Sequence, residues 1–66
     1  MSIQVLAQAF SRPALATIAD RAEHNAKLLI ELEPKPWRRT KAQNDAIDTF
    51  RQLAAYARRV IELMEE

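Results

Sequence analysis

The chain contains no cysteine and no glycine. Without cysteine it has no disulfide to stabilise it, and a structural zinc site loses its commonest ligand. Without glycine it has no loop in which the backbone closely approaches a phosphate, which excludes nucleotide sites of the Walker and dinucleotide-binding types. Any tight turn must therefore be made from residues that disfavour positive φ.

Long apolar runs are also missing. The first ten residues, MSIQVLAQAF, have neither the positive charge nor the continuous apolar stretch of a secretory signal. No other stretch is apolar over the length that a bilayer crossing requires. We therefore expect a soluble, cytoplasmic protein.

An excess of one charge is absent as well, because ten Lys and Arg residues are balanced by nine Asp and Glu. This balance argues against a protein devoted to coating nucleic acid, which needs clustered and uncompensated cations. The 66 residues make one small domain, 1–66. A domain of this size buries only about 60% of the surface that its unfolded chain exposes. Self-association is the simplest remaining source of stability.

The first half of the chain predicts an amphipathic helix over about 12–33. Ser11 is placed to cap its start, and Pro13 fits its first turn, where a missing N–H has no cost. Pro34 disfavours helical geometry at Glu33 and so ends the helix. Apolar residues recur at helical spacing. They are Leu15, Ile18, Ala19, Ala22, Ala26, Leu29 and Leu32.

A second helix is predicted over about 41–65. Thr40 and Gln43 have the spacing of a capping box, in which each side chain bonds the other's backbone amide. Pro36 offers an alternative start near Trp37, but we favour Thr40, preceded by an irregular or single-turn segment. The apolar stripe has a period of 3.6 residues. It consists of Ala46, Ile47, Phe50, Leu53, Ala54, Ala57, Val60, Ile61 and Met64.

Residues 3–10 also fit one face of a helix, through Ile3, Leu6, Ala7 and Phe10. A helix of this length is unstable on its own in water. The segment either docks against the two long helices and completes the core, continues into the first helix with a kink at Pro13, or forms a mobile tail or a partner-binding arm. We favour the docked arrangement.

Two antiparallel helices cannot shield both of their apolar stripes. We therefore predict an all-α hairpin that dimerises into a four-helix bundle. Asn25 lies on the apolar side, where its amide either pairs with its symmetry mate and fixes the register or sits at the edge in water. The residues predicted for the core and the dimer interface are Leu15, Ile18, Ala22, Asn25, Leu29, Leu32, Ile47, Phe50, Leu53, Ala57, Ile61 and Met64.

Charged residues on the outer faces are spaced for pairing within a helix. The expected pairs are Asp48 with Arg51 and Arg58 with Glu62. Asp20 and His24 share a helical turn, but a closed metal site needs more ligands than these two. No nucleophile and base form a recognisable set. We therefore expect no metal, no other cofactor, no catalytic residue and no enzymatic activity.

The connection EPKPWRRTKAQ, 33–43, contains residues typical of turns together with residue types that are common in binding sites. Lys35, Arg38, Arg39 and Lys41 surround the only tryptophan. Cations beside an aromatic ring suit single-stranded DNA or RNA, and they also suit a protein partner. Alternatively, Trp37 only covers the open end of the bundle, against Leu32 or Ala42, and the cations keep the turn soluble.

Protein binding is the interpretation that we favour, because a second small apolar strip lies along the predicted helix 41–65. Tyr56 and Leu63 are seven residues apart, off the main stripe and next to Arg59. This strip either serves the dimer or contacts another protein. The predicted partner-binding residues are Trp37, Arg38, Arg39, Tyr56, Arg59 and Leu63.

The plan of the chain resembles that of the small helical-hairpin proteins of temperate Pseudomonas phages. The resemblance lies in the helix start Ser11-Arg12-Pro13, the connection Pro34-Lys35-Pro36-Trp37 and the helix end Ile61-Glu62-Leu63-Met64. These proteins include a quorum-sensing anti-activator that dimerises and inhibits a LuxR-type regulator and a type IV pilus ATPase. The resemblance implies a dimeric inhibitor of a host regulatory protein, such as a LuxR-type transcription regulator, acting in the host cytoplasm.

Overall fold

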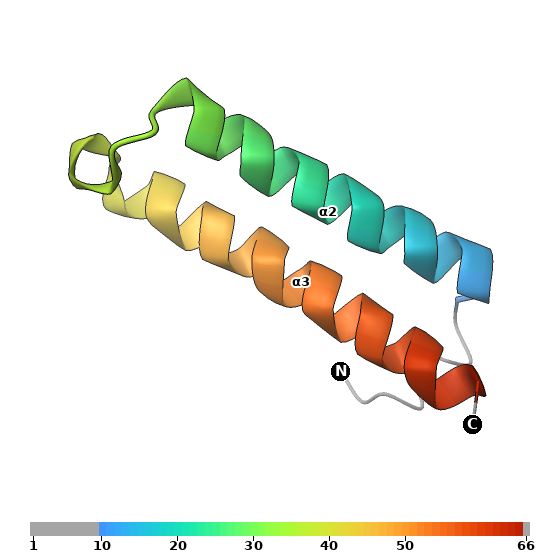
Figure 1. Cartoon of the computed structure of the whole chain (residues 1–66). Coiled ribbons are helices and arrows are strands. Elements are labelled where there is room, and N and C mark those ends of the chain that lie inside the picture. Colours follow the sequence, from blue (N-terminus) through green and yellow to red (C-terminus); the bar gives the residue numbers. More distant parts are fainter. Residues whose placement is uncertain (1–9, 66) are drawn as a thin grey trace.

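The computed structural model describes residues 10–65, and two antiparallel helices account for most of them (Figure 1). The order is α2 (Arg12–Leu32), the 3-10 turn η1 (Pro36–Arg38) and α3 (Lys41–Glu65). This confirms the predicted helical hairpin. Neither α2 nor α3 has an apolar stretch long enough to cross a membrane. The predicted N-terminal segment, 3–10, lies outside the described residues except for Phe10.

Both ends of α2 follow from local chemistry. The Ser11 hydroxyl accepts a hydrogen bond from the Ala14 amide at 3.3 Å, and Pro13 lies in the first turn. At the other end, Glu33 is extended, with φ −144°, and its amide donates to the Leu29 carbonyl at 3.4 Å. The helix ends at Leu32, one residue before the predicted boundary, because Pro34 already restricts Glu33.

The start of α3 is a reciprocal capping box. The Gln43 amide donates to the Thr40 hydroxyl at 3.1 Å, and the Thr40 amide donates to the Gln43 side-chain oxygen at 2.8 Å. The helix begins at Lys41, as the sequence predicts. The alternative start near Trp37 is wrong, because Pro36–Arg38 forms a separate 3-10 turn.

The core between the helices is narrow and rich in alanine. Leu15 and Val60 are its largest fully buried side chains. The other buried residues are Ala19, Ala22, Ala26, Ile47, Ala54 and Ala57. Small side chains let the two helix axes approach closely. A core built this way buries few large side chains, so most of the large apolar residues lie around it rather than in it.

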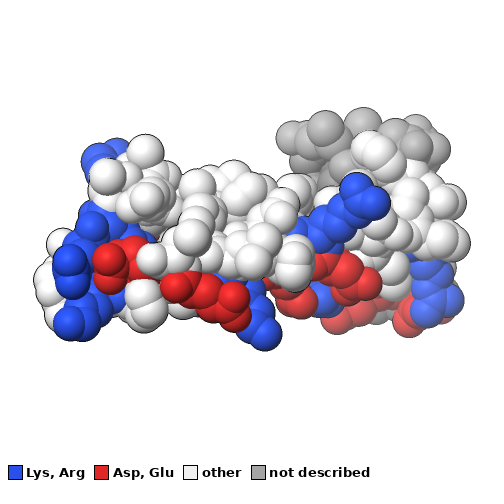
Figure 2. All heavy atoms as spheres, turned by 90° about the horizontal axis from the view of Figure 1, so that it is seen from above, with Lys and Arg blue, Asp and Glu red and all other residues white. Residues whose placement is uncertain are grey.

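Ion pairs between the helices line one edge of the hairpin. Arg58 of α3 pairs with Asp20 at 3.6 Å and with Glu23, both on α2. Arg12 and Glu65 pair across the open end. Figure 2 shows the acidic side chains in a row along this edge, whereas uncharged atoms cover much of the adjoining surface.

These contacts correct the pairs predicted within α3. Arg58 reaches α2 rather than Glu62, and Glu62 instead pairs with Arg59 at 3.1 Å. Among the described residues no ion pair joins Asp48 to Arg51. The reason is that antiparallel packing brings carboxylates of α2 within reach of Arg58.

Candidate protein-binding sites

The connection between the helices contains no glycine and is held by backbone hydrogen bonds. Two backbone hydrogen bonds close the 3-10 turn, from the Arg38 amide to the Lys35 carbonyl at 3.0 Å and from the Arg39 amide to the Pro36 carbonyl at 3.2 Å. The described backbone contains no residue with positive φ. Pro34 and Pro36 fix their own φ angles and further limit the conformations of this segment.

Arg39 joins the residues that follow α2 to the first turn of α3. Its Nε donates to the Glu33 carbonyl at 2.7 Å, and its terminal nitrogens donate to the Pro34 carbonyl at 3.2 Å and to Asn44 Oδ1 at 3.5 Å. Asn44 in turn donates to the Pro36 carbonyl at 3.3 Å. Arg39 therefore supports the turn, whereas the sequence placed it only in the partner-binding set.

Trp37 lies on this anchored turn, in the 3-10 segment Pro36–Arg38. It is 79% exposed. A ring that covered the end of the helices would be largely buried, so within the single hairpin Trp37 does not cover Leu32 or Ala42. Leu32 is itself 77% exposed, and Ala42 is exposed as well.

The charges around Trp37 do not cancel. Arg38 pairs with Glu33 at 3.8 Å, and Lys41 pairs with Asp45 at 3.0 Å. Arg39 donates only to neutral oxygens, so no carboxylate compensates its charge among the described residues.

The Lys35 ammonium likewise has no carboxylate partner in the described part of the chain. The turn therefore carries two uncompensated positive charges. Figure 2 shows this concentration of Lys and Arg at the end of the molecule where the connection lies.

The predicted strip of Tyr56, Arg59 and Leu63 lies far from the turn. Tyr56 is partly buried and packs against the core, and Leu63 is half-buried. Arg59 is exposed and paired with Glu62. Fifteen residues of α3 separate Lys41 from Tyr56, a rise of about 22 Å. The six predicted partner-binding residues thus fall into two separate groups.

A third surface is an apolar face on the side of the hairpin away from the ion pairs. Leu28 is 45% exposed, Leu32 77% and Leu53 44%. A shallow groove of about 300 Å³ runs between the helices here. We call this surface the apolar face. It comprises Asn25, Leu28, Leu29, Leu32, Phe50 and Leu53.

The residues predicted for the core and the dimer interface divide between this face and the interior. Those buried in the single chain are Leu15, Ala22, Ile47 and Ala57. Those half-buried are Ile18, Leu29, Phe50 and Ile61, and those exposed are Asn25, Leu32, Leu53 and Met64. A single hairpin therefore encloses only part of the predicted apolar stripes.

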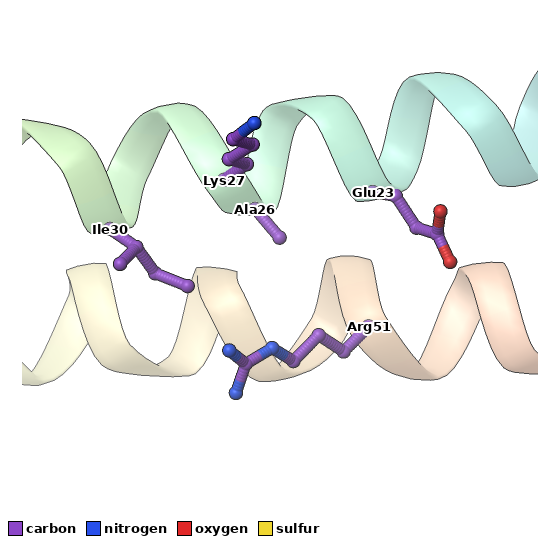
Figure 3. Close-up of a pocket in the computed structure, with 5 residues that line it drawn as sticks. All are labelled: Glu23, Ala26, Lys27, Ile30 and Arg51. Atoms are coloured by element: carbon purple, nitrogen blue, oxygen red, sulfur yellow. The ribbon is translucent and has the colours of Figure 1, made fainter.

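A hollow on the charged edge lacks the features of a ligand site. Ala26 and Ile30 lie beneath it, and Glu23, Lys27 and Arg51 surround it. Figure 3 shows the ends of the Lys27 and Arg51 side chains pointing away from one another. Polar groups must converge to hold a small molecule in one orientation, and these do not. The described residues also contain no cluster of acids and histidine able to hold a metal ion.

Compared with protein-family models, curated proteins and solved structures, the chain gives no match. The geometry of the hairpin is therefore the basis for assigning a function.

Proposed function

We propose that this chain is a non-catalytic protein-binding module that works as a homodimer and blocks a regulatory protein. The observation that carries the binding role is Trp37, four-fifths exposed on a turn that Arg39 and two prolines hold in place. Tryptophan is among the residues most enriched in binding hot spots. A side chain presented on a fixed backbone loses little entropy when a partner binds it.

The apolar face supports the dimer. Leu28, Leu32 and Leu53 remain 44 to 77% exposed although the core consists mainly of alanine. A second copy of the chain is the occupant that we propose, because it would supply the large side chains that the single core lacks. From Asn25 to Leu32 the face rises about 10 Å along α2. A standard interface buries about 800 Å² on each partner, so the dimer must also cover Ile18 and Ile61, which are half-buried in the single hairpin.

Asn25 supplies the register in this proposal. It is exposed in the single hairpin and lines the groove of the apolar face. At a twofold axis its amide can donate to and accept from the same residue of the other copy. A polar pair of this kind disfavours shifted packings, in which each amide would be buried without a partner.

The dimer can be tested with matched charge substitutions. Leu28→Glu places a carboxylate on the apolar face, whereas Arg51→Glu places one on the opposite, charged edge. Sedimentation equilibrium should give a dimer for the natural chain and for Arg51→Glu, and a monomer for Leu28→Glu. Circular dichroism verifies that each variant remains helical. A natural chain that stays monomeric over the full concentration range refutes the dimer.

The blocking role is supported by the resemblance to the phage helical hairpins, which also suggests a host regulator, such as a LuxR-type protein, as the target. The test is affinity capture from host lysate with the natural chain and with Trp37→Ala as baits. A regulatory protein should be retained by the natural chain and lost with Trp37→Ala. A reporter controlled by the captured regulator should then lose activity when the natural chain is expressed.

Two outcomes would change the assignment. If both baits retain the same proteins equally, Trp37 is not the binding site. Tyr56→Ala tests the second group of predicted residues, and its readout must include helicity because Tyr56 packs against the core. If capture is lost together with helicity, Tyr56 belongs to the core and not to the partner surface.

A further inference from the structure

We infer that the turn end of the hairpin recognises an acidic protein segment that carries a large apolar side chain. This deepens the proposed function, on which it rests, by naming the chemistry of the partner. The surface concerned, the turn-end patch, consists of Lys35, Trp37 and Arg38, with the Arg39 guanidinium beside them.

The apolar part of the recognition comes from Trp37. An aromatic ring of this size can bury 150 to 250 Å² in an interface, and at 79% exposure almost all of the Trp37 surface remains available. Nothing else in the described structure covers the ring. An aliphatic or aromatic side chain of the partner placed against it would remove both surfaces from water.

The acidic part follows from the uncompensated charges. Between 32 and 45 there are four cations and two carboxylates, a difference of two positive charges. Arg38 and Lys41 have carboxylate partners, whereas Lys35 has none and Arg39 donates to carbonyl and amide oxygens. Lys35 and Arg39, which have no carboxylate partner among the described residues, are therefore the groups available to a partner carboxylate.

The Arg39 charge is also fixed in position. Its three hydrogen bonds hold the guanidinium against the turn, so binding of an anion nearby does not have to immobilise a flexible side chain. Charges that are already in position contribute to recognition at a lower entropic cost. Lys35 is long and flexible and can adapt to the partner's exact geometry.

The same observations disfavour nucleic acid. Affinity for a phosphate backbone grows with the number of phosphates neutralised, and here two charges are uncompensated. Over the longer range 31–48 the four cations are matched by four carboxylates, Glu31, Glu33, Asp45 and Asp48, so a phosphate chain that extends beyond the patch meets no net positive charge. A short peptide segment needs to reach only the patch itself.

The experiment uses a fluorescein-labelled peptide of alternating glutamate and leucine, followed by fluorescence anisotropy. Two control peptides replace either all glutamates by glutamine or all leucines by serine, and labelled oligo(dT) tests nucleic acid. The acidic apolar peptide should bind most tightly, and its affinity should fall as salt is raised, because the charges are exposed.

Variants assign the binding to the patch. Trp37→Ala and Lys35→Glu should each lower the affinity for the acidic apolar peptide by about tenfold or more, as expected for hot-spot residues. Arg51→Glu changes the net charge by the same amount as Lys35→Glu but lies along α3, away from the turn. It should alter the affinity by less than about twofold once salt screens its charge.

Several results would overturn the inference. The glutamine peptide could bind as tightly as the acidic peptide, or oligo(dT) more tightly. Arg51→Glu could lower the peptide affinity as much as Lys35→Glu does, or the acidic peptide could fail to bind at all. Each of these is distinguishable from failure of the proposed function. If Trp37→Ala still abolishes capture of a regulator from lysate, the protein-binding role stands and only the acidic chemistry of the partner is wrong.

Discussion

Replacing Arg39 by alanine should destabilise the hairpin, whereas replacing the adjacent Arg38 should not. The two residues have the same side chain and the same charge, and they follow one another on the same turn. Arg39 donates to Glu33, Pro34 and Asn44, but Arg38 has only an exposed pair with Glu33 at 3.8 Å. The comparison therefore isolates the hydrogen bonds from the charge.

The magnitude follows from the geometry of these bonds. A hydrogen bond from a charged donor contributes about 1.5 to 3 kcal/mol, and the Nε bond to Glu33, at 2.7 Å, is the short one. The bonds at 3.2 and 3.5 Å are longer and weaker. Ordering a long side chain opposes these gains by about 1.5 to 2 kcal/mol. We therefore expect Arg39→Ala to lower the free energy of unfolding by about 1 to 2 kcal/mol.

Thermal and urea unfolding measure this difference. In a domain of this size 1 kcal/mol shifts Tm by about 4 to 8 °C, so Arg39→Ala should unfold roughly 5 to 15 °C earlier. Arg38→Ala should stay within about 0.5 kcal/mol of the natural chain, as exposed ion pairs usually do. All proteins must be compared at one concentration, because dimerisation would make Tm concentration-dependent.

Arg39→Lys provides a further control. Lysine keeps the charge but has no planar fork, so it cannot reproduce the set of bonds to Glu33, Pro34 and Asn44. It should recover less than half of the lost stability. Equal destabilisation by Arg38→Ala and Arg39→Ala would refute the reasoning, and so would full recovery with lysine.

Three further predictions concern the helices. Leu15→Ala should destabilise the hairpin by about 2 to 5 kcal/mol and reduce helicity at room temperature, because Leu15 is fully buried in a small core; retained stability would mean that the site collapses or that α2 packs differently. Thr40→Ala should cost about 1 kcal/mol in urea unfolding by removing the capping box. Thr49→Ala, the control, should leave the free energy of unfolding almost unchanged, because the Thr49 hydroxyl donates only to the Asp45 carbonyl within α3. An equal loss of stability in Thr40→Ala and Thr49→Ala would disprove the role of the cap. Arg58→Ala should lower the free energy of unfolding by up to about 1 kcal/mol at low salt and by much less in about 1 M salt, because the ion pairs with α2 are exposed. Arg59→Ala, which removes a pair within α3, should have a smaller effect. A loss at Arg58 that does not depend on salt would indicate that packing of its side chain is responsible instead.

The caps and ends of the helices, which depend on residues close in sequence, were predictable. The Ser11 cap and the Thr40 capping box each join residues three apart, and Pro34 acts on the residue directly before it. Such features depend on backbone geometry that every helix shares. The same holds for the apolar period, which identified both stripes before their packing was known.

Contacts between the helices were not predictable in the same way. The pairing of Arg58 with Asp20 and Glu23 depends on how far α2 and α3 slide past each other. The sequence offered Glu62 as an equally suitable partner one turn away. The anchoring role of Arg39 also depends on the path of the turn, which brings its guanidinium against the Glu33 and Pro34 carbonyls.

The candidate site shows the same division. Sequence composition drew attention to Trp37 among four cations, but only the folded turn distinguishes Arg39, which is engaged with the backbone, from Lys35, which is not. Likewise Leu32 and Leu29 look equivalent in the apolar stripe, and yet one is 77% exposed and the other half-buried.

By itself, then, the sequence determined that this chain forms two amphipathic helices, where each begins and ends, and that a connection with two prolines and no glycine joins them. Tertiary structure decided which apolar residues the hairpin encloses, which arginines pair across it and which charges at the turn remain uncompensated. The physical reason is the separation in sequence between the residues that interact. Caps and helical periodicity involve residues within four positions of one another, whereas burial and ion pairing depend on the relative placement of two helices that only their packing sets.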